Sequence, residues 1–129
     1  MAIPRRLVDQ VLERDNGFCL LAGPFCLGEA TVADHRANRG SGGSRELNNP
    51  VCLVAACHLC NGWKETAHSL ELIGLKERGL RVLKASTNAA TVTRCEETPV
   101  QDLDGQWYWL LPDGTRQRFE RDVTWTSES

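Results

Sequence analysis

Residues 33–64 read ADHRANRGSGGSRELNNPVCLVAACHLCNGWK, and they hold the most informative spacings of the 129-residue chain. Two short apolar runs, at residues 30–34 and 51–55, are bounded by turn-forming residues, which predicts two short strands. The residues between the two runs are glycines, serines and asparagines without an apolar period, so they predict a loop. A helix is expected to open at Cys57 and to extend to Ala67.

Four cysteines form two pairs around this stretch. Cys57 and Cys60 have the C-x-x-C spacing that lets two thiolates face one metal from a turn leading into a helix. Cys19 and Cys26 have six residues between them, with a Gly-Pro bend inside the gap. No secretory signal accompanies the cysteines, and clustered cysteines in a reducing compartment favour metal over disulfides. The four thiolates therefore predict a tetrahedral structural zinc site, with buried free thiols, or two disulfides in a secreted context, as alternatives.

The order of these features resembles the HNH endonuclease family, the ββα-metal nucleases, and in particular its zinc-stapled members. A strand ending in Asp34-His35, a loop with Gly42-Gly43, a second strand and a C-x-x-C-Asn-x-x-Lys motif carry the resemblance, which covers residues 17–66. In style the chain is similar to the short stand-alone HNH proteins of bacteriophages. The resemblance implies an α+β fold with a ββα-metal core and a metal-dependent DNA endonuclease activity.

By resemblance, His35 is the general base that activates water, while Asp34 and Asn61 hold a catalytic Mg²⁺ or Mn²⁺. The chemistry suits those residue types, because hard divalent cations prefer oxygen ligands and histidine titrates near neutral pH. Lys64 lies one helical turn after Asn61 and is expected to meet the phosphate. The alternatives are a structural histidine, a turn carboxylate at Asp34 and a solvated lysine.

Two positions depart from the family pattern. Asn61 stands where the family usually has His or Asn, so it is a permitted variant, and the second departure is at the position of the middle asparagine. That position falls on Cys52 in this chain, and a thiol is a weak hydrogen-bonding group, so the orientation of His35 is in question. A rival register places Asn49 in the middle position and His58 in the last, but it puts Val54 where the family has its first zinc cysteine. Cys52 itself is expected to be a small buried hydrophobe, as is Cys95.

Charge and composition divide the chain. Residues 1–94 hold 12 Lys and Arg against 9 acids, whereas residues 95–129 hold 3 against 8. We expect an HNH nuclease domain over residues 1–84 with an N-terminal helix after Pro4, a linker over 85–99, and a β-hairpin appendage over 100–129. The hairpin prediction rests on two extended runs, Gln106–Leu111 and Thr115–Phe119, that flank a Pro-Asp-Gly turn.

The expected partner is double-stranded DNA. The formal net charge of −2 excludes a strongly basic, histone-like binder, but Arg36, Arg39 and Arg45 flank His35 and predict phosphate contacts. A second hypothesis is a catalytically weak or inactive zinc-stapled module that binds DNA or docks a protein such as a phage packaging enzyme. No apolar run is long enough to span a bilayer, so we expect a cytoplasmic protein, in the host cell if it is phage-encoded.

Overall fold

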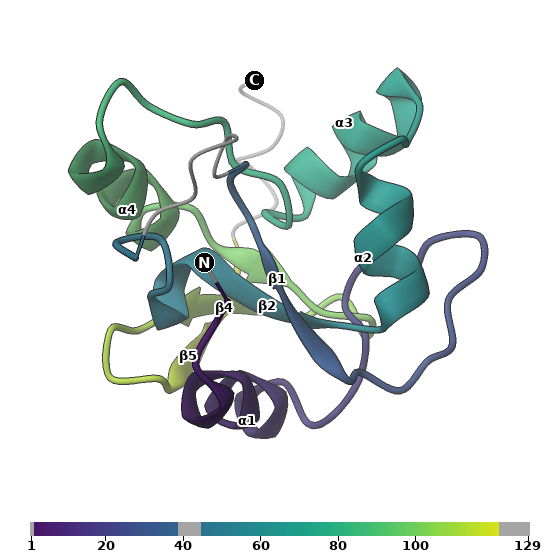
Figure 1. Ribbon diagram of the computed structural model, residues 1–129, viewed down its shortest axis with the longest axis horizontal. Coiled ribbons are helices and arrows are strands. Elements are labelled where there is room, and N and C mark those ends of the chain that lie inside the picture. The colour runs from purple at the N-terminus through teal and green to yellow at the C-terminus, as the bar shows by residue number, and fades with distance from the viewer. Residues whose placement is uncertain (1, 39–44, 122–129) are drawn as a thin grey trace.

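A computed structural model of the chain describes residues 2–38 and 45–121. Within these ranges the fold is mixed α+β (Figure 1). None of the helices in this described part of the chain is long and apolar enough to cross a membrane. The elements run in the order α1 (Arg5–Arg14), β1 (Val32–His35), the 3-10 helix η1 (Pro50–Cys52), β2 (Leu53–Ala56), α2 (His58–Lys64), α3 (Ser69–Glu77), α4 (Asn88–Glu96), β3 (Val100–Gln101), β4 (Trp107–Leu110) and β5 (Arg116–Phe119).

Helix α1 has the limits that the sequence predicts. Pro4 is its N-cap, where the missing amide hydrogen costs nothing. Asn16 and Gly17 follow the helix with φ angles of 59° and 74°, a left-handed conformation that ends it. Between these limits the apolar stripe that includes Val8 and Val11 packs against β1 and β2.

Strands β1 and β2 form a two-stranded antiparallel sheet in which Asp34 pairs with Val54 and His35 with Leu53. Leu53 and Ala55 pack with α1, whereas Val54 and Ala56 belong to a second buried cluster on the other side. This alternation is the two-residue period of a strand buried on both faces. Helix α2 follows β2 directly, so the two strands and the helix come in the expected order. The first two residues of the predicted second strand belong instead to η1.

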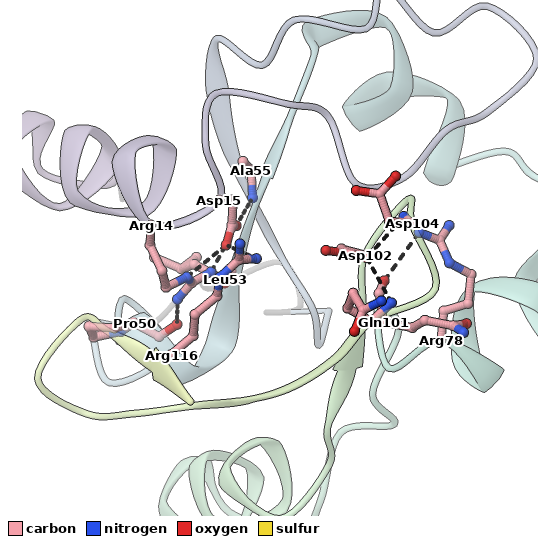
Figure 2. A network of polar contacts seen from close by, with 11 residues as sticks. Arg14, Asp15, Pro50, Leu53, Ala55, Arg78, Gln101, Asp102, Asp104 and Arg116 are labelled. Carbon is pink, nitrogen blue, oxygen red and sulfur yellow. Dashed lines mark hydrogen bonds and ion pairs between the residues drawn. The ribbon is translucent and has the colours of Figure 1, made fainter. Parts of the chain in front are cut away.

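A buried ion pair joins α1 to the strand pair and to β5 (Figure 2). The Arg14 guanidinium donates to both carboxylate oxygens of Asp15, at 2.9 and 3.0 Å, and to the carbonyls of Pro50 and Leu53. Asp15 in turn accepts from the amide of Ala55 at 2.9 Å. Arg116 of β5 lies 3.8 Å from the same carboxylate. Every polar group in this network has a partner, which buried charges require.

Residues 85–99, expected to be a linker, contain α4. Thr87 caps the helix by accepting a hydrogen bond from the amide of Ala90 at 3.0 Å. Thr91 and Cys95 lie one turn apart on its buried face, which packs against η1. The segment is therefore an integral part of the fold, and its small side chains are what allow α4 to pack closely.

The predicted C-terminal hairpin is present as β4 and β5, and a short strand, β3, extends it to a three-stranded sheet. Trp109 and Phe119 stack across the hairpin with ring centroids 4.8 Å apart. Val100 and Leu110 belong to the same buried cluster as Cys19, Cys57 and Cys60. The described part of the C-terminal sheet thus shares its core with the cysteine pairs.

Candidate functional site

The four cysteines of the two sequence pairs converge. The sulfur atoms of Cys19, Cys26, Cys57 and Cys60 all lie within 4.8 Å of one another, and three of the four residues are buried. Four sulfurs around a tetrahedral zinc, at a Zn–S distance of about 2.3 Å, lie about 3.8 Å apart. The donor set and its spacing therefore fit a metal such as zinc. Within residues 2–38 and 45–121 this is the one group of three or more Cys, His, Asp and Glu residues with metal-binding geometry.

Backbone amides point at the sulfurs. The amide of Gly23 donates to Cys60 at 3.3 Å, and those of Leu27 and Cys60 donate to Cys57 at 3.5 and 3.4 Å. Burial alone would raise the pKa of Cys57, but these amides and the neighbouring thiols lower it to about 7. Burial raises the pKa of Cys19. Amide donors of this kind stabilise thiolates, the form in which cysteine binds metal.

Gly23 is required by the close approach of α2 to the first cysteine pair. A Cβ at this position would lie 2.7 Å from Cε3 of the Trp63 ring. Because the amide of Gly23 also donates to Cys60, any displacement of this turn would move a sulfur. The glycine thus lets the turn of the first cysteine pair lie close enough to α2 for its amide to reach Cys60.

A cleft of about 760 Å³ lies at the end of β1, where the sequence analysis expects the catalytic residues to be. Asp34, His35, Asn61 and Lys64 all line it. Since His35 is the last residue of β1, the strand alternation that separates neighbouring side chains ends there. Asn61 comes from α2, which contacts β1. The carboxylate, the imidazole and the amide therefore border one space.

Lys64 is fully engaged with protein groups. Its ammonium donates to Oδ2 of Asp34 at 2.7 Å and to the carbonyls of His35 and Leu80 at 2.9 and 3.0 Å. These three bonds use all three donors of the ammonium. Burial raises the pKa of Asp34, and the Lys64 charge opposes that rise. The expected phosphate contact of Lys64 is therefore replaced by a positioning contact that holds Asp34 and the end of β1.

Asn48, which the sequence argument did not single out, holds His35. Its Oδ1 lies 2.9 Å from Nε2 of His35, a distance that fixes the ring orientation. The neighbouring Asn49 accepts from the amide of Val51 and so caps η1. Cys52 is buried beside Cys95 and does not line the cleft. The signal available in the sequence was the pair of asparagines before Pro50. One of them could supply the side-chain amide that the chain lacks at the position of Cys52.

The rival register is disfavoured by geometry. His58 is exposed in the first turn of α2 and is absent from the cleft lining, which Asn61 joins. Val54 is buried in the core. The cleft therefore brings together Asp34, His35 and Asn61 of the favoured register, whereas His58 of the rival register lies outside it.

The three arginines expected to bind DNA have different positions. Arg36 is wholly buried: its guanidinium donates to the carbonyls of Gly79, Val51, Cys95 and Thr98 at 2.7–2.9 Å. Burial lowers the pKa of Arg36 to about 10. Contact of this residue with DNA is thus wrong, because its donors join β1 to three other segments. Arg45 is exposed, and Arg39 lies outside the described residues.

Comparison with known proteins gives a limited likeness. A segment of 60 residues is 40% identical to the "Gene 4 protein" of Mycobacterium phage L5, and it covers 46% of this chain. The match spans 55% of that phage protein, about half its length. No family model matches the chain, and no solved structure matches it significantly.

Proposed function

We propose that the protein is a metal-dependent endonuclease of the HNH type that hydrolyses phosphodiester bonds in double-stranded DNA. The observation that carries the proposal is that Asp34, His35 and Asn61 border one cleft beside a four-cysteine cluster. The similarity of one segment to a mycobacteriophage protein is consistent with the expected phage origin.

The donor set in the cleft fits a hard divalent cation. Asp34 offers a carboxylate and Asn61 an amide oxygen, and Mg²⁺ in proteins is typically held by one or two carboxylates together with waters and substrate phosphate oxygens. When bound, Mg²⁺ or Mn²⁺ would supply Lewis-acid stabilisation of the charge that develops on the phosphate. Lys64 holds Oδ2 of Asp34, so it orients the carboxylate.

His35 acts as the general base in this proposal. The imidazole takes a proton from a water molecule, whose oxygen attacks phosphorus while the bond from phosphorus to the 3′ oxygen breaks. The products are a 5′-phosphate and, once the leaving oxygen is protonated, a 3′-hydroxyl. Asn48 fixes the ring so that one nitrogen stays directed for this transfer. The four-cysteine cluster, with zinc bound, keeps α2 against the strand pair and so holds Asn61 in place.

Digestion of supercoiled plasmid with Mg²⁺ or Mn²⁺ tests the proposal. The parent protein is expected to cleave, and His35→Ala is expected to lose at least 100-fold in rate, the order of a general base's contribution. His68→Ala is a matched control, because His68 is exposed at the start of α3 and away from the cleft. Equal activity of His35→Ala and parent, or an inactive parent with every metal, would contradict the proposal.

A second candidate is a zinc-stapled module that binds DNA or a protein without catalysis. The observation favouring it is that Lys64 already occupies Oδ2 of Asp34, which weakens the case for a cation there. Titration of the zinc-loaded protein with Mn²⁺, followed by paramagnetic resonance, separates the two. A weaker Mn²⁺ site lost in Asp34→Asn supports the nuclease, and no Mn²⁺ binding supports the module.

A further inference from the structure

Two cysteines outside the four-cysteine cluster lie side by side in the core. Cys52, the last residue of η1, and Cys95, in the last turn of α4, are each 1% exposed, and both thiols are free. Their side chains are within hydrogen-bonding distance of each other, at the place where α4 packs on η1. Neither residue lines the cleft of the proposed nuclease site. The core therefore contains a second pair of thiols that the proposed reaction does not use.

Arg36 holds the backbone on both sides of this thiol pair. One guanidinium nitrogen, Nη1, donates to the carbonyls of Val51 and Cys95 at 2.7 and 2.9 Å. The backbone amide of Arg36 donates to the carbonyl of Cys52 at 2.8 Å. Because one nitrogen bonds both segments, the end of η1 and the end of α4 are fixed next to each other. The contact between the two side chains is thus set by the backbone as well as by burial.

The same arginine favours the ionised form of one of the two thiols. The hydrogen bond from Cys52 and the charge of Arg36 lower the pKa of Cys95 to about 7, although burial opposes them. The hydrogen bond to Cys95 and burial raise the pKa of Cys52, so Cys52 is the donor and Cys95 the acceptor. The guanidinium of Arg36 is bonded to neutral carbonyls, so an anionic Cys95 also supplies a nearby counter-charge. A thiolate beside a positive charge is the nucleophilic form of cysteine.

A small oxidant has a route to the pair through α4. The buried face of this helix consists of Thr91 and Cys95, small side chains that bury little apolar surface. Elements with few buried apolar contacts open locally at a low free-energy cost. Hydrogen peroxide, which is little larger than water, therefore needs only a local opening of α4 to reach Cys95.

We infer that Cys52 and Cys95 are a redox modification site that closes to a disulfide on reaction with a peroxide. The Cys95 thiolate attacks one oxygen of hydrogen peroxide, the O–O bond breaks, and the other oxygen leaves as hydroxide and takes up a proton to become water. The Cys52 sulfur then attacks the sulfenic sulfur of Cys95, gives up its proton and expels the hydroxyl as a second water. Two thiols are oxidised by two electrons in total, and one peroxide is reduced to two waters. The new bond ties η1 to α4, and the inference does not depend on the proposed nuclease activity.

Peptide mapping of the oxidised protein tests the inference. The zinc-loaded full chain is treated with hydrogen peroxide, its remaining thiols are alkylated, and it is digested with trypsin and chymotrypsin without reduction. Cleavage after Leu53 separates Cys52 from Cys57, and cleavage after Arg94 places Cys95 at the start of another peptide. We expect these two peptides to be linked, with a mass about 2 Da below the sum of the free peptides, and dithiothreitol should separate them. Zinc content is measured on the same sample.

The alanine variants separate the two chemical steps. Cys95→Ala should form no linked peptide, whereas Cys52→Ala lacks the resolving thiol, so peroxide should leave Cys95 as a sulfenic acid that dimedone labels. Failure of dimedone to label Cys95 in a folded Cys52→Ala variant would overturn its role as the attacking thiol. The parent decides the rest: no link in protein that retains its zinc overturns the inference, as does a link found only in the fraction that has lost zinc.

Discussion

Replacing Arg36 with methionine should destabilise the protein severely. The side chain is completely buried, and its guanidinium makes four hydrogen bonds of 2.7–2.9 Å to backbone carbonyls. A hydrogen bond from a charged donor contributes about 1.5–3 kcal/mol, so the four together contribute about 6–12 kcal/mol before compensation. Burying the guanidinium costs several kcal/mol, which the variant recovers, and methionine fills part of the space. The expected net loss is about 3–5 kcal/mol, because the variant leaves four buried carbonyls without their donor, each at a cost of about 1–3 kcal/mol before relaxation.

The free energy of unfolding, from denaturant titration of the zinc-loaded protein followed by tryptophan fluorescence, measures this loss. A domain of this kind has about 5–15 kcal/mol to lose, so Arg36→Met is expected to be marginal. Arg36→Lys keeps the charge but not the planar fork, and it should lie between variant and parent. Arg118→Met, at an exposed position, should stay within about 0.5 kcal/mol of the parent. A loss below about 1 kcal/mol in Arg36→Met would refute the reasoning that Arg36 holds the segments together.

Three other changes test the site. Cys57→Ser with Cys60→Ser should abolish zinc retention and lower the melting temperature sharply, because such a site supplies folding energy. Elemental analysis measures the zinc content, and retained zinc with an unchanged melting temperature would contradict the metal site. Lys64→Met leaves Asp34 buried without its counter-charge, so the pKa of Asp34 should rise further. A carboxyl with a raised folded-state pKa stabilises at low pH and loses that contribution as pH rises, so the destabilisation by Lys64→Met should be larger at pH 8 than at pH 5 in urea melts; a pH-independent loss would count against it. Asn48→Ala should lower kcat of plasmid cleavage about tenfold with little change in KM, since it releases the His35 ring, and an unaltered kcat would exclude that role.

The sequence predicted the features that depend on local spacing. Short motifs predicted four features: the cysteine pairs, the helix after Pro4, the order of two strands and a helix, and the turn before Thr115. Local patterns of this kind are reliable because turn and cap chemistry acts within a few residues.

The residues that the sequence misplaced depend on distant partners. In the sequence, Arg36 looks like a solvated arginine in a polar loop. It is buried because its guanidinium donates to four backbone carbonyls from distant segments, those of Val51, Gly79, Cys95 and Thr98. Helix α4 was hidden because its buried face is made of Thr91 and Cys95 rather than large apolar residues. A small-residue face has a weak hydrophobic period, although Thr87 was available as a cap signal.

The shared core limits how far this protein can be shortened. A fragment ending at residue 84 would lose the carbonyls of Cys95 and Thr98, two of the four acceptors of Arg36. It would also lose Val100 and Leu110, and so open the cluster that surrounds Cys19 and Cys57 to water. Engineering that grafts only the strand–strand–helix portion onto another protein would therefore have to supply a substitute cover for this side of the cysteine cluster.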